Sequence, residues 1–479
     1  MGELYRNLID GQWLDGDGTV ANVNPSNTEE VIGHAAQATA AQVRDAIAAA
    51  RAAQPQWAAA GLEQRHRALM GAGAELMERS RELGRELSRE EGKPLAEGVG
   101  EVYRAGQFFQ YYAAEVHRQF GETADSVRPG IEIDIRREPV GVVGIISPWN
   151  FPMATAAWKL APALAFGNAV VFKPANLVPA SAWAMVEVLH RHELPPGVVN
   201  LVMGRGSSVG EALINSPDID AISFTGSQDV GRRVARATAA NLVRCQLEMG
   251  SKNALVIMDD ADLDLAVQAA VAGGYSGTGQ KCTASSRLVV HEAVHDAFVD
   301  KLAVRLEAMT VGPAVDETTE IGPLADAAQL ENVEGYIRLA ETEGAHRVVG
   351  GTRVELDTPG HYLSPCLLTG TDNRMRINQE EAFGPLATVI RVAGIDEAIR
   401  VTNDTVFGLT AGIVTGSLSY ANRFRREAHA GCVMVNLPTA GTDYHVPFGG
   451  RRTSSYGPRE QGRYAREFYT TVKTSYVRS

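Results

Sequence analysis

Apolar, β-branched runs alternate with helix-like segments between residues 140 and 253. Each of the first four runs ends in a Pro or Gly turn, after which apolar residues resume at helical spacing. The predicted strands are 140–147, 168–173, 198–203, 221–225 and 243–247. This alternation predicts a parallel sheet with right-handed crossovers, covered by helices on both faces. Ligands of such sheets bind beyond the carboxyl ends of the strands, so the chemistry is expected there.

Outside this region the pattern predicts an all-helical segment first and a second α/β unit later. Short strands are predicted within 1–35, and helices at 40–60, 62–90 and 97–119, with a break at Gly92-Lys93-Pro94. Strict alternation at 131–135 predicts a half-buried strand. Further strands are predicted at 254–258, 287–291, 387–392, 412–414 and 432–436. The tail at 467–477 alternates as well, and we expect it to pair with another sheet or another subunit.

Composition and charge narrow the class of protein. A chain of 479 residues is expected to form two or three domains. The net charge of −12 argues against nucleic-acid binding, and no apolar run approaches the roughly 20 residues of a membrane span. The four cysteines lie far apart without zinc-ligand spacing, so no metal is expected. Residues 1–11 lack the apolar segment of a secretory signal. The small number of cysteines and the lack of this signal predict that the protein is in the reducing cytoplasm.

Three side chains carry candidate chemistry. Cys282 lies among small and polar residues in Gly277–Ala284, where it is either a presented nucleophile or an ordinary buried cysteine. Glu248 lies at the end of the fifth strand between apolar neighbours. It is either a general base or a carboxylate that caps a helix or forms a salt bridge. Asn150 follows a Pro-Trp turn at the end of the first strand, where its amide could stabilise an oxyanion or make an Asx turn.

The sequence contains no perfect match to the glycine-rich turn that binds the phosphates of a dinucleotide. No perfect G-x-G-x-x-G opens a helix after a strand, and the run from Gly204 to Gly210 is one residue too long. The segment 224–231 is the better candidate, because it joins a clear strand to a clear helix whose first N–H groups favour an anion, although a plain tight turn fits too. Lys173, at the end of the second strand, could reach a ribose or phosphate, or could lie along the surface.

Seven segments in order resemble the aldehyde dehydrogenase superfamily. They are Pro148–Pro152, Trp158–Leu164, Phe224–Ser227, Leu247–Gly250, Gly279–Cys282, Glu381–Pro385 and Pro447–Gly450. The resemblance covers essentially the whole chain. It implies an α/β fold with a Rossmann-like parallel-sheet cofactor domain (1–120 and 140–250), a second α/β catalytic domain (251–450) and a small bridging β oligomerisation element (121–139 and 460–479). It further implies a homodimer or homotetramer.

The resemblance also implies roles for named residues. Cys282 would be the nucleophile and Glu248 the base, while the Asn150 amide and the Cys282 N–H would form the oxyanion hole. Lys159 would support proton traffic near the base. The residues expected around an NAD or NADP cofactor are Ser147, Trp149, Asn150, Lys173, Ala175, Asn176, Gly206, Gly210, Phe224, Thr225, Gly226, Ser227, Met249, Gly250, Glu381 and Phe383.

The implied reaction oxidises an aldehyde to an acid through a thiohemiacetal and a thioester on Cys282. Members that transfer the acyl group to coenzyme A lack the glutamate, so Glu248 favours hydrolysis. Many NAD-preferring members carry a glutamate at the position of Asn176, and its replacement by a neutral residue predicts that NADP is tolerated or preferred. A non-enzymatic protein on this scaffold is the alternative, but it would not need to keep the three candidate residues.

The substrate is expected to be a semialdehyde. Succinate-semialdehyde dehydrogenases resemble the chain but carry arginines at the positions of Trp158 and Ser276. The segments 281–287, 439–447 and 454–462 are similar to the branch that oxidises α-ketoglutarate semialdehyde (2,5-dioxopentanoate). The alternatives are succinate semialdehyde and a broad range of apolar or aromatic aldehydes. Phe151, Trp158 and Phe448 are expected to form an apolar tunnel for the substrate. Arg287, Tyr444 and His445 are either polar substrate contacts in this tunnel or structural residues.

Overall fold

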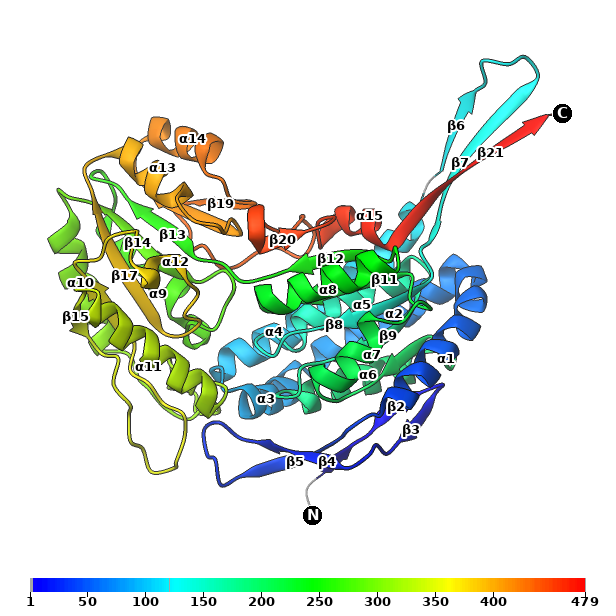
Figure 1. The fold of residues 1–479 in the computed structure, drawn as a ribbon, viewed down its shortest axis with the longest axis horizontal. Coiled ribbons are helices and arrows are strands. Elements are labelled where there is room, and N and C mark those ends of the chain that lie inside the picture. The colour runs from blue at the N-terminus through cyan, green and yellow to red at the C-terminus, as the bar shows by residue number, and fades with distance from the viewer. Residues whose placement is uncertain (1–2, 120, 479) are drawn as a thin grey trace.

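Two large sheets and two small ones organise the chain in a computed structural model that describes residues 3–119 and 121–478 (Figure 1). Residues 1, 2, 120 and 479, which fall within the predicted bounds 1–120 and 460–479, lie outside this description. The fold is α/β, as predicted. Among the described residues, no helix is both long and apolar enough to cross a membrane.

The first large sheet has eight strands in the order β20-β12-β11-β8-β9-β10-β2-β3. Its five central strands are parallel, as the alternating pattern predicts, and antiparallel strands flank them at both edges. The bounds are β2 (Asn7–Ile9), β3 (Gln12–Leu14), β8 (Val142–Ile146), β9 (Ala169–Lys173), β10 (Val199–Leu201), β11 (Ala221–Thr225), β12 (Arg244–Glu248) and β20 (Ser455–Tyr456).

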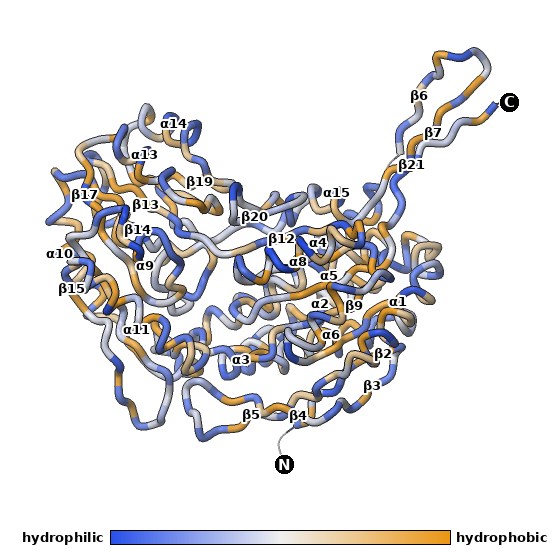
Figure 2. Tube along the Cα trace, viewed as in Figure 1, coloured by the Kyte–Doolittle hydropathy of each residue, from blue (hydrophilic) through white to orange (hydrophobic). Residues whose placement is uncertain are grey.

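Helices cover both faces of this sheet. One apolar core joins it to helices that include α4 and α5, and a second core joins it to α1, α7 and α8. The helices before residue 250 are α1 (Ala40–Ala59), α2 (Leu62–Glu78), α3 (Ser80–Glu91), α4 (Leu95–Glu115), α5 (Ala154–Ala165), α6 (Pro179–Arg191), α7 (Glu211–Ile214) and α8 (Gln228–Ala240). Strands buried on both faces read as continuous apolar runs, which the hydrophobic colouring of both large sheets shows (Figure 2).

The second large sheet has seven strands in the order β15-β16-β17-β14-β13-β18-β19, all parallel except β15. The bounds are β13 (Asn253–Ile257), β14 (Ser285–His291), β15 (His346–Val349), β16 (Cys366–Thr369), β17 (Leu386–Val392), β18 (Thr410–Val414) and β19 (Cys432–Val435). Its helices are α9 (Leu263–Gly274), α10 (His295–Glu307), α11 (Ala327–Thr342), α12 (Arg376–Gln379), α13 (Ile395–Asn403) and α14 (Leu418–Glu427).

Two three-stranded sheets complete the fold. One contains β1 (Glu3–Tyr5), β5 (Val31–Ala36) and β4 (Thr19–Val23). The other contains β6 (Glu122–Asp125), β7 (Ile131–Pro139) and β21 (Thr470–Arg478), and it projects away from the rest of the molecule (Figure 1). The short α15 (Arg466–Tyr469) replaces the start of the predicted tail strand, and β21 then pairs antiparallel with β7.

Two predicted helices differ from the structure. The helix predicted at 62–90 is divided at Arg79, which ends α2 and begins α3 with a non-helical backbone and forms ion pairs with Glu75 and Glu82. The helix expected from about Ser208 is a π-helical turn at Gly206–Gly210 followed by the four-residue α7. Segment 455–456, which lies outside all the predicted domain bounds, forms β20 and pairs with β12.

Candidate active site

A cavity of about 480 Å³ lies at the carboxyl ends of β8, β9, β11 and β12, where the sheet topology predicts it. It also receives residues from the second half of the chain, which come from α11 and from segments outside the strands of the second large sheet. Its lining contains 18 of the residues expected in the site: Ser147, Trp149, Asn150, Phe151, Trp158, Lys173, Ala175, Phe224, Thr225, Gly226, Ser227, Glu248, Met249, Gly250, Cys282, Glu381, Phe383 and Phe448.

Cys282 reaches the cavity from a tightly turned backbone. Gly277 and Thr278 have positive φ values of 60° and 54°, and a side chain at Gly279 would overlap the Gly384 carbonyl, so this turn requires glycine. The Asn253 amide donates to the Cys282 carbonyl at 2.8 Å. Burial, followed by the Glu381 and Glu248 carboxylates, raises the pKa of the thiol above its ordinary value. The cysteine therefore needs a base to take its proton.

Glu248 is the carboxylate available for this task. It ends β12 and is buried, and the Ser455 hydroxyl donates to its Oε2 at 2.5 Å. Burial and the neighbouring Glu460 carboxylate raise the pKa of Glu248 well above its ordinary value, while the hydrogen bond from Ser455 lowers it. A carboxyl group with a raised pKa is a stronger base once ionised, as general base catalysis near neutral pH requires.

Asn150 connects the turn after β8 to the cysteine segment. Its side-chain Nδ2 donates to the Gln280 carbonyl at 2.9 Å, two residues before Cys282. A primary amide has two N–H donors, so one of them is available to an oxygen atom bound beside Cys282. The arrangement of a thiol, a buried carboxylate and an amide donor around one cavity can support addition of the thiol to a carbonyl carbon.

Lys159 lies behind the base instead of lining the cavity. It is fully buried, donates to the Ser223 hydroxyl at 2.9 Å and forms an ion pair with Glu460. The second oxygen of Glu460, Oε2, has no hydrogen-bond partner among the described residues. Lys159 is therefore connected to Glu248 by way of Glu460, whose carboxylate raises the pKa of Glu248. This position is consistent with the supporting role expected for Lys159 near the base.

The other end of the cavity has the features of a dinucleotide site. The buried hydroxyls of Ser147 and Thr225 lack hydrogen-bond partners within 3–119 and 121–478. The helix α8 begins directly after Ser227, so its first N–H groups can bind an anion. Burial lowers the pKa of Lys173 to about 8, and its ammonium donates to the Pro174 carbonyl at 2.8 Å. These unpaired donors and acceptors fit a ribose and a pyrophosphate.

Glu381 and two aromatic rings close this end. The Ser251 N–H donates to the Glu381 carboxylate at 2.8 Å, and burial raises the pKa of Glu381 to about 7. A side chain at Gly250 would overlap this carboxylate. The rings of Trp149 and Phe383 meet edge to face, with centroids 5.5 Å apart. Apolar ring faces and a carboxylate suit a nicotinamide riboside.

Comparison with known proteins agrees with this geometry. A model described as the aldehyde dehydrogenase family matches residues 13–475. The chain belongs to the aldehyde dehydrogenase family.

Its aldehyde dehydrogenase relatives match over their full lengths. The chain is 42% identical to an α-ketoglutarate semialdehyde dehydrogenase of Haloferax volcanii, over 99% of both chains. It is 38% identical to an α-ketoglutaric semialdehyde dehydrogenase of Bacillus subtilis, over 99% of this chain and 98% of the relative. The crystal structure of betaine aldehyde dehydrogenase from Staphylococcus aureus in complex with NAD+ is 34% identical and superposes with a TM-score of 0.96, covering 99% of this chain and 95% of the other.

An aromatic wall borders the cavity of this aldehyde dehydrogenase. Trp158 and Phe448 line the cavity with ring centroids 5.5 Å apart. Phe108 of α4 contacts Trp158 edge to face at 5.9 Å, and Tyr444 contacts Phe108 at 6.3 Å. The Arg104 guanidinium lies 5.4 Å from the centre of the Tyr444 ring. Tyr444 is thus two ring contacts from the cavity. His445, whose ring meets that of Tyr444 edge to face with centroids 5.5 Å apart, is also outside the lining.

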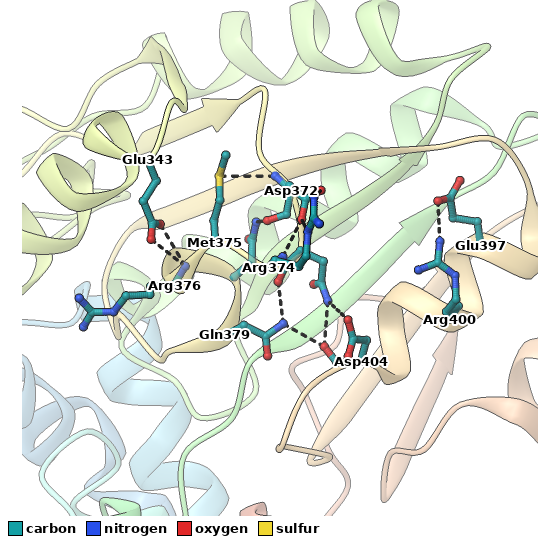
Figure 3. A network of polar contacts seen from close by, with 11 residues as sticks. Glu343, Asp372, Arg374, Met375, Arg376, Gln379, Glu397, Arg400 and Asp404 are labelled. Atoms are coloured by element: carbon teal, nitrogen blue, oxygen red, sulfur yellow. Dashed lines mark hydrogen bonds and ion pairs between the residues drawn. The ribbon is translucent and has the colours of Figure 1, made fainter.

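The prediction that Arg287 contacts the substrate is wrong. Arg287 is buried on β14, where its guanidinium donates to the carbonyls of Lys252, Val401 and Thr402 and to the side chain of Asn373. Figure 3 shows the polar network beside it, in which Gln379 at the end of α12 donates to the carbonyl of Asp404 after α13. Arg287 therefore holds elements of the second sheet together.

Three residues expected at the cofactor lie outside the lining. Asn176 is half-buried in the turn after β9, three residues beyond Lys173. Gly206 begins the π-helical turn with open space around it, and a Cβ at Gly210, the end of this turn, would lie 3.8 Å from Lys173 Cε. Of the three, Gly210 lies beside Lys173, and none of them is part of the cavity lining.

Several residues of the site carried no role in the sequence analysis. Ser455 and Glu460 belong to the segment 454–462, which was used only for the resemblance. Lys93 was predicted only as part of a helix break, because the neighbouring Glu90, Glu91 and Gly92 give no local sign that it is buried. Gln329 and Asn332 of α11 line the cavity but follow no strand, so the rule that ligands bind at strand ends could not find them.

Proposed function

We propose that this aldehyde dehydrogenase uses NAD or NADP to oxidise an anionic semialdehyde, α-ketoglutarate semialdehyde, to the acid through a thioester on Cys282. The observation that carries the proposal is that Cys282, Glu248 and Asn150 line one cavity, which also contains the unpaired polar atoms suited to a dinucleotide. None of these side chains alone would indicate this chemistry.

The residues act in a defined order. Glu248 takes the proton of the Cys282 thiol, and Sγ attacks the carbonyl carbon of the aldehyde, which forms a C–S bond. The carbonyl oxygen becomes an oxyanion that accepts hydrogen bonds from the Asn150 amide and the Cys282 N–H. Each such donor contributes about 2.7–4 kcal/mol to transition-state stabilisation.

The dinucleotide, when bound, accepts a hydride from the thiohemiacetal carbon, which leaves a thioester on Cys282. Ser147, Lys173, Thr225, Ser227 and Glu381 would hold it. Glu248 releases to solvent the proton that it took from the thiol and then deprotonates a water molecule, which attacks the thioester carbon. The C–S bond breaks, the acid leaves and the thiol is regenerated.

Asn176 supports the use of both dinucleotides. A neutral side chain near the ribose end does not repel the 2′-phosphate of NADP, as a glutamate would. Comparable initial rates at low concentrations of NAD and NADP are expected, and strict dependence on NAD would contradict this part of the proposal.

Two observations favour an anionic semialdehyde. Relatives of similar length from Haloferax volcanii and Bacillus subtilis are named as α-ketoglutarate semialdehyde dehydrogenases. In addition, Arg104 forms no ion pair among the described residues and lies beyond the aromatic wall, where it could attract a remote carboxylate. Succinate semialdehyde, which is also anionic, is one competing substrate. Apolar or aromatic aldehydes are the other, because Trp158 and Phe448 supply an apolar surface.

The test follows reduced dinucleotide by absorbance with 2,5-dioxopentanoate, succinate semialdehyde and benzaldehyde, compared by kcat/KM. We expect the first to give the highest value and C282S to abolish turnover. The matched control is C245S, because Cys245 is a half-buried cysteine on β12 outside the cavity. Full activity of C282S would overturn the mechanism, and inactivity of the wild type with every aldehyde would favour a non-enzymatic protein.

A further inference from the structure

The turn that carries Asn150 and Phe151 rests on a buried ion pair. The Lys93 ammonium donates to Glu101 Oε2 at 2.6 Å and to the backbone carbonyl of Asn150 at 2.6 Å. The side chains of Lys93 and Glu101 are only 3% and 2% exposed, so water cannot replace these contacts. The ammonium also lies 4.0 Å from the centre of the Phe151 ring. The Lys93 ammonium therefore contacts two consecutive residues of the site, Asn150 and Phe151.

Glu101 extends this contact into the next helix. Its Oε1 accepts hydrogen bonds from the N–H groups of Met153 at 2.8 Å and Ala154 at 3.0 Å, where α5 begins. The turn between β8 and α5 is thus held at its middle by Lys93 and at its end by Glu101. The left-handed backbone of Gly92 (φ 100°) ends α3 and allows the chain to present Lys93 before α4 begins.

The same helix holds the segment that carries the nucleophile. Glu97 lies one turn before Glu101 on α4, so the two carboxylates share a helix face. Its Oε1 accepts the N–H of Gly277 at 2.8 Å, at the start of the turn that leads to Cys282. The first turns of α4 therefore contact both the Asn150 turn and the Cys282 turn.

We propose that Lys93, Glu97 and Glu101 are positioning residues that set the distance between the Asn150 amide and Cys282. The proposal rests on the proposed function. A scaffold that only needed stability would not require these charges, because apolar residues replace a buried ion pair with little loss, and often with a gain, of stability. Fixed donors and acceptors are instead required when an oxyanion donor must be placed within a fraction of an ångström.

The decisive variant is K93M, which keeps the length of the side chain and removes its donors. We expect kcat to fall about tenfold or more, since misplacement by about 1 Å can cost a hundredfold in rate. The KM for the dinucleotide and the rate of Cys282 alkylation by iodoacetamide should change less than about twofold, because neither needs the oxyanion donor. K93R, which restores donors, should recover part of the loss.

The matched control is E90Q. Glu90 is also buried and also accepts two N–H groups at the start of a helix, those of Ala180 and Ser181 in α6, but it does not contact the Asn150 turn. We expect E90Q to lower the melting temperature and leave kcat close to that of the wild type. Equal losses of kcat in E90Q and E101Q would overturn the proposal.

A folded K93M with wild-type kcat would also overturn it. If K93M does not fold, the pair E97A and E97Q gives the answer, because Glu97 is only half-buried and glutamine keeps the acceptor for Gly277. E97A should then lose kcat while E97Q retains it, and equal values for the two would contradict the proposal. Failure of the proposed function is a different result, since the wild type would then oxidise none of the aldehydes.

Discussion

At the scale of single residues, opposing influences set the pKa of Glu248. Burial and the Glu460 carboxylate raise this pKa, and the Ser455 hydroxyl lowers it by donating to the ionised form. Because the base works only when deprotonated, a higher pKa moves the rise of kcat to higher pH. In the proposed mechanism, the pH dependence of the reaction is therefore controlled by residues 207 to 212 positions away in the chain.

We predict that S455A raises the pKa of Glu248 further, because the ionised form loses a hydrogen bond. At neutral pH kcat should fall several-fold, and the rising limb of the profile of kcat against pH should shift to higher pH by about one unit, which corresponds to ~1.4 kcal/mol. The measurement is kcat at saturating substrate from neutral to alkaline pH. S455T, which keeps the hydroxyl, is the control, and superimposable profiles of S455A and the wild type would refute the prediction.

Sequence reasoning found the residues that end strands and missed those that modulate them. Glu248 and Asn150 could be located because a strand end in a parallel sheet faces the ligand. Glu460 could not, because no local pattern shows that a distant carboxylate is buried beside Glu248. Arg287 was expected to reach the substrate, but its side chain contacts other elements of the second sheet. The position of a residue in a strand does not show which neighbouring element a long side chain will contact.

At the scale of elements, the end of β12 approaches Glu381 so closely that only glycine fits at position 250. We predict that G250A displaces the Glu381 carboxylate and raises the KM for the dinucleotide about tenfold, with a smaller effect on the rate of alkylation of Cys282. Kinetics at varied dinucleotide concentration measure this. G100A is the control, since a Cβ at Gly100 on α4 meets open space. An unchanged KM in G250A would show that Glu381 does not contact the dinucleotide.

Ten of the eleven parallel strands of the two large sheets were predicted within about two residues, because burial on both faces leaves continuous apolar runs. The eleventh, β16, was missed although it is buried. The strand β15 was missed, since His346, Arg347 and Val348 are exposed and give no such run. The division of α2 from α3 was missed as well. Arg79 is an ordinary helix residue, and its non-helical backbone follows from tertiary packing that the local sequence does not encode.

At the scale of the whole molecule, the projecting sheet of β6, β7 and β21 supports the proposal of a homodimer or homotetramer. Val472 on β21 is 54% exposed, and an apolar side chain on a strand that extends from the body is suited to an interface between subunits. We predict that V472D lowers the molar mass measured by light scattering after size-exclusion chromatography. V304D on α10, where Val304 is 68% exposed, should not, and equal masses for all three proteins would contradict the prediction.

The pairing of β20 with β12 also has a consequence for synthesis on the ribosome. The cysteine, the asparagine and the general base have all been translated by residue 282, but the serine and the glutamate that adjust the base follow only at residues 455 and 460. A chain that stops before residue 455 therefore contains Cys282 and Glu248 but lacks Ser455 and Glu460, which shift the pKa of Glu248. In the proposed mechanism, the surroundings of the base are therefore complete only after residue 460 has been translated.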